Sequence, residues 1–361
     1  MSSDSHFIDF QDRINDSIKR VGAVWLRWNY AQQLLLVCVV LFIKNAADIE
    51  LRNIQEAYLP GALEFPTAVG YFSGSFGQAA VASLLGVSTT TQWVALHGLL
   101  ILAGLGVAFW LIWRTGRETR SFLVLALAAA TATASLLVSI GKYDVITFLG
   151  AVIFALARTT PVAIFGVAVM ASGNPEQAIV ASVAVLALSG AVEFRHLRAR
   201  AVIAVCVTGI TWGIVQLWFA LSGVGVGRLE LVPVFLAESL ARVITSPGNE
   251  IWSWLNAGWL LAVIALFAAT RLSRKWLVVA LFVLPGLVTI ITADGARVFG
   301  SVVLAAYLLV ALWIGQTQPW RSENRDSVMG LAVIAMVTLP VIVDTPGWLS
   351  DLVIGRLAAF F

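Results

Sequence analysis

Long apolar runs constrain this chain more than any other feature of its sequence. One run, VALHGLLILAGLGVAFWLIW at residues 94–113, is as long as a helix that crosses a bilayer, which needs about 20 apolar residues. Over the whole chain 60% of residues are hydrophobic and 12% are charged, about half the charge of a soluble domain. Lipid cannot satisfy exposed backbone groups, and the runs lack the alternation of barrel strands. We therefore expect an all-α, polytopic membrane protein.

The apolar runs predict about eleven spans. The fourth and fifth of these are short for a bilayer, and Arg158 to Pro161 between them could form either a tight turn or the break in a re-entrant pair. The predicted spans lie near residues 28–45, 92–113, 121–140, 145–157, 161–172, 177–192, 201–221, 251–270, 276–292, 298–316 and 328–344.

The positive residues predict the orientation of these spans. Most of the 23 Lys and Arg residues fall on one side of the predicted membrane, and positive loops stay in the cytosol. We therefore expect a cytosolic N-terminal segment at 1–27, a transmembrane domain at 28–344 and an outer amphipathic segment at 345–361. The positive residues are scattered and the net charge is only +3, so the sequence gives no support for a nucleic-acid partner.

Two outer segments are long, at about 46–91 and 222–250. Apolar residues recur at helical spacing in both, with polar residues between them, which predicts amphipathic helices lying along the membrane interface. More than half of the 20 acidic residues fall on this outer side. Acids contribute little to orientation, so part of this bias should reflect function.

Each short outer loop places an acid at the end of a helix: Asp144 in GKYD, Glu176 in NPEQ and Asp294 in ADGAR. For Asp144 and Glu176, a helix cap or first-turn acid is the alternative to a role in binding substrate. Asp294 and Arg297 are three residues apart, so a plain ion pair is the alternative there.

Asp48 and Glu50 follow the first predicted span with almost no spacer. Carboxylates at the membrane boundary are costly unless they are paired or face a polar cavity. One interpretation is a charged interfacial collar. The other is a carboxylate that accepts a proton from a substrate hydroxyl or holds a divalent metal.

A cytosolic N-terminus, one span, a large outer loop that opens with the acidic Asp48-Ile49-Glu50, and then a multi-span body resemble the GT-C superfamily of membrane glycosyltransferases. The resemblance implies a GT-C-like bundle in a bacterial plasma membrane, acting on the non-cytosolic face. It implies transfer of a sugar from a polyprenyl-phosphate donor to a glycan, lipid or polysaccharide hydroxyl. Asp48 would be the base, and Glu50 an orienting acid or a ligand of Mg or Mn.

A polyprenyl-phosphate donor needs cations near the outer leaflet, because its leaving group departs as a phosphate anion. Arg is suited to phosphate by its bidentate geometry. For Arg228 and Arg242 the alternative is a side chain that anchors in the lipid interface. The predicted phosphate ligands are Arg297, Lys142, Arg228 and Arg242.

Two other classes compete with this hypothesis. A polymerase or ligase of lipid-linked polysaccharides would share the many spans and the outer arginines. A transporter or lipid flippase would also have many spans, but an ion-coupled transporter would place charges at mid-membrane, where this chain has almost none. Membrane lipids are expected partners under every alternative.

Overall fold

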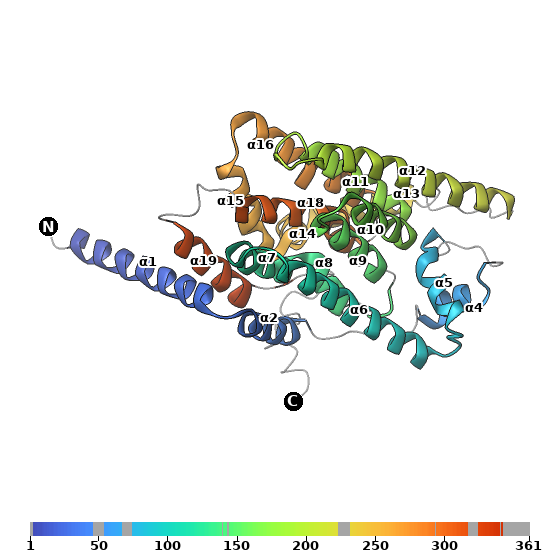
Figure 1. Cartoon of the computed structure of the whole chain (residues 1–361), viewed down its shortest axis with the longest axis horizontal. Coiled ribbons are helices and arrows are strands. Elements are labelled where there is room, and N and C mark those ends of the chain that lie inside the picture. Colours follow the sequence, from blue (N-terminus) through green and yellow to red (C-terminus); the bar gives the residue numbers. More distant parts are fainter. Residues whose placement is uncertain are drawn as a thin grey trace.

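The computed structural model describes residues 3–45, 54–66, 74–138, 140–142, 144–222, 232–292, 294–316, 324–339 and 341. Within these ranges the chain is helical and has no strand (Figure 1). The helices are α1 (Ser3–Arg27), α2 (Tyr30–Lys44), η1 (Ile54–Tyr58), α4 (Leu59–Leu63), α5 (Phe76–Leu84), α6 (Thr90–Trp113), α7 (Arg117–Ala129), α8 (Thr131–Val138), α9 (Asp144–Leu156), α10 (Thr160–Gly173), α11 (Pro175–Leu188), α12 (Leu197–Leu221), α13 (Val232–Thr245), α14 (Pro247–Leu255), η4 (Asn256–Gly258), α15 (Trp259–Ala268), α16 (Arg271–Val278), η5 (Val279–Val283), α17 (Leu284–Ile290), α18 (Gly295–Gln316) and α19 (Arg325–Thr338). The all-α prediction is confirmed for the described residues.

Among the described residues, five helices are long and apolar enough to cross a membrane, as expected of a membrane protein. The number rises to seven if two bent pairs, α1 with α2 and α7 with α8, are each one span. Helices occur in all eleven predicted segments, but a count of about eleven spans is not confirmed. A helix such as α9, with 13 residues, is about 20 Å long and falls short of a hydrocarbon core of about 30 Å.

Helix α18 lies at the centre of the bundle (Figure 1). Of its most apolar 18-residue stretch, 83% is buried, against 22% for α12, which runs along one edge. Helices α7, α8, α9, α11, α14 and α17 all contact α18. A helix that is apolar all round must be covered by protein or lipid, and here other helices cover most of α18.

Helices α9 and α10 form a tight hairpin. Gly150 and Gly166 let the two backbones touch, since a Cβ atom on Gly166 would lie 2.6 Å from the backbone nitrogen of Phe154. Small residues allow this close approach of helices. Between the helices, residues 157–159 turn the chain without further helix, a geometry that fits both the tight turn and the break in a re-entrant pair.

Two breaks in the helices meet inside the bundle. The α7–α8 pair bends by 50° near Ala130, and α14 gives way to α15 at Asn256, which has a positive φ of 48°. Thr131 Oγ1 donates to the carbonyl of Ser253 at 3.0 Å, and Asn256 Nδ2 donates to Thr131 Oγ1 at 2.8 Å. These bonds satisfy backbone groups freed by the breaks and fix α14 against α8.

Buried polar contacts also fix the loop at 140–142. Trp93 Nε1 donates to the carbonyl of Gly141 at 3.0 Å. Gly141 has a φ of +106°, and a Cβ there would lie 2.6 Å from Ile54 Cδ1, so glycine suits the position. The buried His97 contacts Gln78 and donates from Nδ1 to the carbonyl of Trp93 at 2.8 Å. Residues of η1, α5 and α6 therefore hold the loop that leads into α9.

Helix α1 belongs to the same helical body. Gly22 and Gly330 bring the backbones of α1 and α19 into contact, and the two helices lie side by side in Figure 1. At the end of α2, Lys44 Nζ donates to the carbonyls of Met336 and Leu339 near the end of α19. The predicted segment at 345–361 lies outside the described residues.

Candidate functional site

A group of buried and partly buried ionisable residues lies where the predicted outer ends of α9 and α18 meet α13 and α14. We call this group the outer ionic cluster. It consists of Lys142, Asp144, Arg242, Glu250, Asp294 and Arg297, which lie on four different parts of the chain.

Arg297 is the centre of the cluster. Its Nη1 donates to Asp144 Oδ2 at 2.9 Å, and its Nη2 contacts Asp294 Oδ2. The side chains of Arg297 and Asp144 are each 6% exposed. Moving such charges out of water is expensive unless they are paired with good geometry. The two carboxylates therefore account for how Arg297 can be buried at the first turn of α18.

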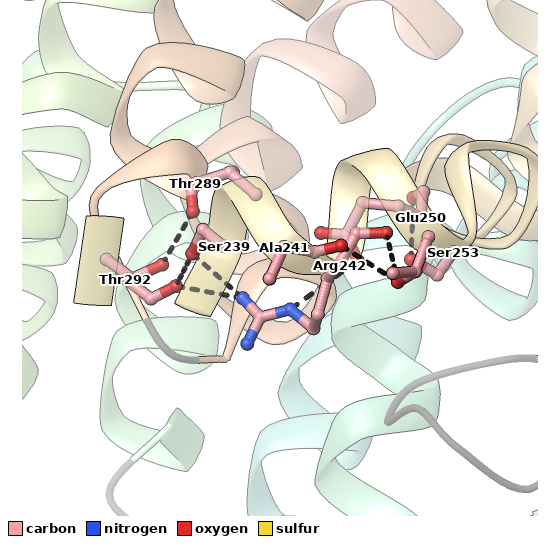
Figure 2. Close-up of polar contacts among 8 residues, drawn as sticks. Ser239, Ala241, Arg242, Glu250, Ser253, Thr289 and Thr292 are labelled. Atoms are coloured by element: carbon pink, nitrogen blue, oxygen red, sulfur yellow. Dashed lines mark hydrogen bonds and ion pairs between the residues drawn. The ribbon is translucent and has the colours of Figure 1, made fainter. Parts of the chain in front are cut away.

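Arg242 joins α13 to the same region (Figure 2). Its Nη2 donates to Ser239 Oγ at 2.9 Å and to the carbonyl of Thr292 at 3.0 Å, and its Nε lies 3.8 Å from Glu250 Oε2. Ser239 Oγ also donates to the Thr292 carbonyl, at 2.6 Å. These contacts tie α13 to the chain just after α17 and to α14.

Glu250 places a buried carboxylate beside the first residue of α18. It is 5% exposed, and a Cβ atom at Gly295 would collide with its Oε1. A negative charge is favourable there, because the amide groups at the N-terminus of a helix carry partial positive charge. Gly295 is thus the residue that lets the carboxylate approach the helix end.

Of the three carboxylates in the cluster, Asp294 has the most exposed side chain, at 37% against 6% for Asp144 and for Glu250. The positive charge of Arg297 lowers the pKa of Asp294, opposed by burial, and the charges of Lys142 and Arg242 lower it further. The charges of three cations, from the loop before α9, from α13 and from α18, therefore lower the pKa of one carboxylate. It stays charged at neutral pH and is a weak proton acceptor.

The structure brings together five of the nine residues predicted from sequence: Lys142, Asp144, Arg242, Asp294 and Arg297. Asp294 and Arg297 do form the ion pair that their spacing allowed, and Asp144 joins them. Asp48, Glu50 and Arg228 lie outside the described residues.

Glu176 and Glu250 differ from the sequence-based assignments in opposite ways. Glu176 lies in the first turn of α11, behind Asn174, whose side chain accepts from the backbone nitrogen of Gln177 at 3.1 Å. This is the position of a first-turn acid, the alternative that the sequence left open. Glu250 was not among the predicted site residues. Its only signal was an acid following Ser-Pro-Gly-Asn on the outer side.

The three carboxylates of the outer ionic cluster do not by themselves form a site for the divalent metal that the GT-C resemblance implies. Within the described residues, no three His, Cys, Asp or Glu side chains are grouped to hold a metal ion. Asp144 and Asp294 face Arg297, and Glu250 faces Arg242, so a cation there would be repelled by guanidinium groups. Asp48 and Glu50, the predicted metal ligands, are not among the described residues.

Comparison with known proteins found no matching family model, no matching curated protein and no matching solved structure. The class of protein follows from the chain itself: its described part is a helical bundle with five to seven candidate membrane spans. Its activity must be inferred from the outer ionic cluster and from the sequence.

Proposed function

We propose that this protein is a membrane glycosyltransferase that takes a sugar from a polyprenyl-phosphate donor and passes it to a hydroxyl acceptor on the non-cytosolic face. The observation that carries the proposal is a buried Arg297 that contacts both Asp144 and the partly exposed Asp294, with Arg242 and Lys142 close enough for their charges to lower the pKa of Asp294. A place where three cations converge on one partly exposed anion is suited to a phosphate group.

The donor phosphate would take the place of Asp294 beside Arg297. Asp294 is the partly exposed member of its pair, so its side chain can turn toward water. Asp144 would keep Arg297 in position, and Glu250 would keep Arg242 in position, because both carboxylates are buried. The exchange replaces one carboxylate with a phosphate and leaves the buried contacts intact.

The chemistry asks little more of this site than stabilisation of the leaving group. When the bond from the sugar to the phosphate breaks, polyprenyl phosphate departs as an anion, and fixed cations lower the barrier to its departure. The weak basicity of Asp294 suits this electrostatic role. Proton abstraction from the acceptor hydroxyl is assigned to Asp48, with Glu50 to orient it, on the resemblance to GT-C enzymes.

The proposal names the acceptor by class: it is a hydroxyl group of a glycan, lipid or polysaccharide at the outer face of a bacterial plasma membrane. A polymerase or ligase of lipid-linked polysaccharides is the close variant, since it would use the same cations on a polyprenyl-linked substrate.

A lipid flippase is the second candidate, and the paired helix breaks favour it. Discontinuous helices that meet inside a bundle are typical of transporters, where they build a binding site away from either surface. Here Thr131 and Asn256 meet at such breaks. The flippase would move a lipid-linked sugar without breaking its phosphate bond.

The test uses the purified protein in lipid nanodiscs with a panel of polyprenyl-phosphate hexoses and pentoses. Sugar released from the lipid is measured, and binding of polyprenyl phosphate is compared with that of polyprenol of the same length. The variant Arg242→Gln should weaken phosphate binding about tenfold or more, because a charged hydrogen-bond donor is lost. Glu238→Gln, an exposed charge change one turn away on α13, is the matched control.

Each outcome separates the candidates. Sugar release by the unaltered protein that falls in Arg242→Gln, but not in Glu238→Gln, supports the transferase. Binding that depends on Arg242 without sugar release from any donor would favour the flippase. Equal binding of polyprenol and polyprenyl phosphate would refute a phosphate site at the cluster.

A further inference from the structure

A second charged feature lies at the other end of α18. A cavity of about 530 Å³ opens where the C-terminal ends of α6, α9 and α18 meet the loop before α12. Its walls include Arg114, Arg158, Arg195 and Arg200, and none of its described lining residues is Asp or Glu. The outer ionic cluster, at Gly295–Arg297, is nearly the full length of α18 away from Gln316 at this cavity.

Two of these arginines hold the walls of the cavity. Arg200 donates to the carbonyls of Ala157 and Arg158 at 3.0 and 2.8 Å and to Thr160 Oγ1 at 3.1 Å, which caps the end of α9. Arg158 donates to the carbonyl of Arg114 after α6. Satisfying the last carbonyls of helices is a common role for arginine, so these contacts need no ligand.

Arg114 and Arg195 are not used in this way. The guanidinium of Arg114 lies 4.9 Å from the centre of the Trp110 ring. Arg195 is exposed in the loop before α12 and makes no hydrogen bond or ion pair within the described part of the chain. Both keep donors that can face a ligand, next to the fixed charges of Arg158 and Arg200.

Most of the rest of the wall is apolar, and part of it is exposed on the surface of the bundle. Phe154, Leu197 and Leu309 line the cavity, together with Trp110 and Val162. Trp110 is 52% exposed and Val162 46% exposed, so the cavity opens on the surface of α6 and α10 that faces away from the bundle. A small soluble anion would leave this apolar wall unused, whereas a lipid would place its phosphate at the arginines and its chains along the wall.

We propose that this cavity binds the phosphate headgroup of an anionic phospholipid from the cytosolic leaflet, with Arg195 and Arg114 as its ligands. The positive-inside count predicts that this end of the bundle faces the cytosol. Basic pockets between membrane helices on that side suit anionic headgroups. The site does not rest on the proposed sugar transfer, because it shares no residue with the outer ionic cluster.

The experiment measures lipid binding to the purified full chain by native mass spectrometry, with phosphatidylglycerol and phosphatidylcholine titrated in parallel. Arg195→Gln should weaken phosphatidylglycerol binding about fivefold, the effect of one arginine near an anionic headgroup. Arg198→Gln is the matched control, because Arg198 is an exposed arginine three residues away that does not line the cavity. It should leave binding unchanged.

Thermal unfolding with added lipid gives a second readout and checks that Arg195→Gln folds. Phosphatidylglycerol should raise the unfolding temperature of the unaltered protein and of Arg198→Gln more than that of Arg195→Gln. Equal effects of the two variants, or equal binding of phosphatidylcholine, would overturn the proposal. Displacement of the lipid by millimolar inorganic phosphate would overturn it as well, since the site would then be one for a soluble anion.

Discussion

The ion pair between Arg297 and Asp144 should be worth far more than a surface pair of the same length. Arg297→Met leaves Asp144 buried with its main counter-charge removed, and breaking a buried pair in this way costs about 3–5 kcal/mol. Asp144→Asn should cost less, because Arg297 still contacts Asp294. The double variant buries no uncompensated carboxylate at position 144, so its loss should fall short of the sum by about 2 kcal/mol or more.

The chain offers a control pair. Arg325 Nη1 lies 3.0 Å from Glu118 Oε1, nearly the same distance, but these side chains are 40% and 45% exposed against 6% for Arg297 and Asp144. Water screens an exposed pair, so the coupling energy of Arg325→Met with Glu118→Gln should be about 0–1 kcal/mol.

Unfolding by sodium dodecyl sulfate, followed by tryptophan fluorescence, gives the free energies for both cycles, and the 14 Trp residues provide the signal. The two coupling energies are then compared directly. A coupling between Arg297 and Asp144 no larger than that between Arg325 and Glu118 would refute the argument that burial makes the outer pair strong.

Three further predictions follow from the sequence and the cluster. Asp48→Asn should give an inserted, stable protein without transfer activity, whereas Glu56→Gln should keep most of that activity. Near-normal transfer by Asp48→Asn would favour the interpretation of these charges as an interfacial collar. In a cysteine-free background, Ser88→Cys should react with an impermeant label from outside and Arg198→Cys should not, and the reverse pattern would invert the predicted topology. Because Arg297 lowers the pKa of Asp294, this carboxylate stabilises the fold above its unfolded pKa of about 4 and loses that effect as the pH falls through its folded value. Asp294→Asn should therefore lower the unfolding temperature at pH 7 and flatten its fall between pH 7 and pH 3; an unchanged acid profile would contradict the ion pair.

The helices could be predicted because apolar runs and their polar ends are local properties of the sequence. The number of spans could not, because hydropathy does not separate a helix covered by lipid from one covered by protein. Helices α9, α10 and α11 are apolar but only 13–14 residues long. The glycine contact between α9 and α10 at Gly150 and Gly166 shows how such short helices pack against protein instead.

In the candidate site too, contacts between residues close in sequence could be predicted, and contacts that depend on packing could not. The pairing of Asp294 with Arg297 follows from a spacing of three residues on one helix end, so the sequence contained it. The contact of Arg297 with Asp144 spans 153 positions and depends on how α9 and α18 pack. Glu250 is similar, because only the fold brings the first turn of α14 to Gly295, and the local sequence carries no sign that the carboxylate is buried.

Stability alone does not explain why an apolar chain buries these charges. Replacing a buried ion pair with packed hydrophobic residues is often neutral or stabilising, so a bundle shaped only for stability would have little reason to assemble the outer ionic cluster. The cluster balances three cations with three carboxylates, yet one carboxylate, Asp294, is partly exposed; Arg297 contacts it, and the charges of Lys142 and Arg242 lower its pKa further. A neutral cluster can be buried at tolerable cost, and an exposed member can be exchanged for another anion. These are two properties that the proposed site for a lipid-linked phosphate requires, and under that proposal they account for the buried ionic cluster at the N-terminal end of α18.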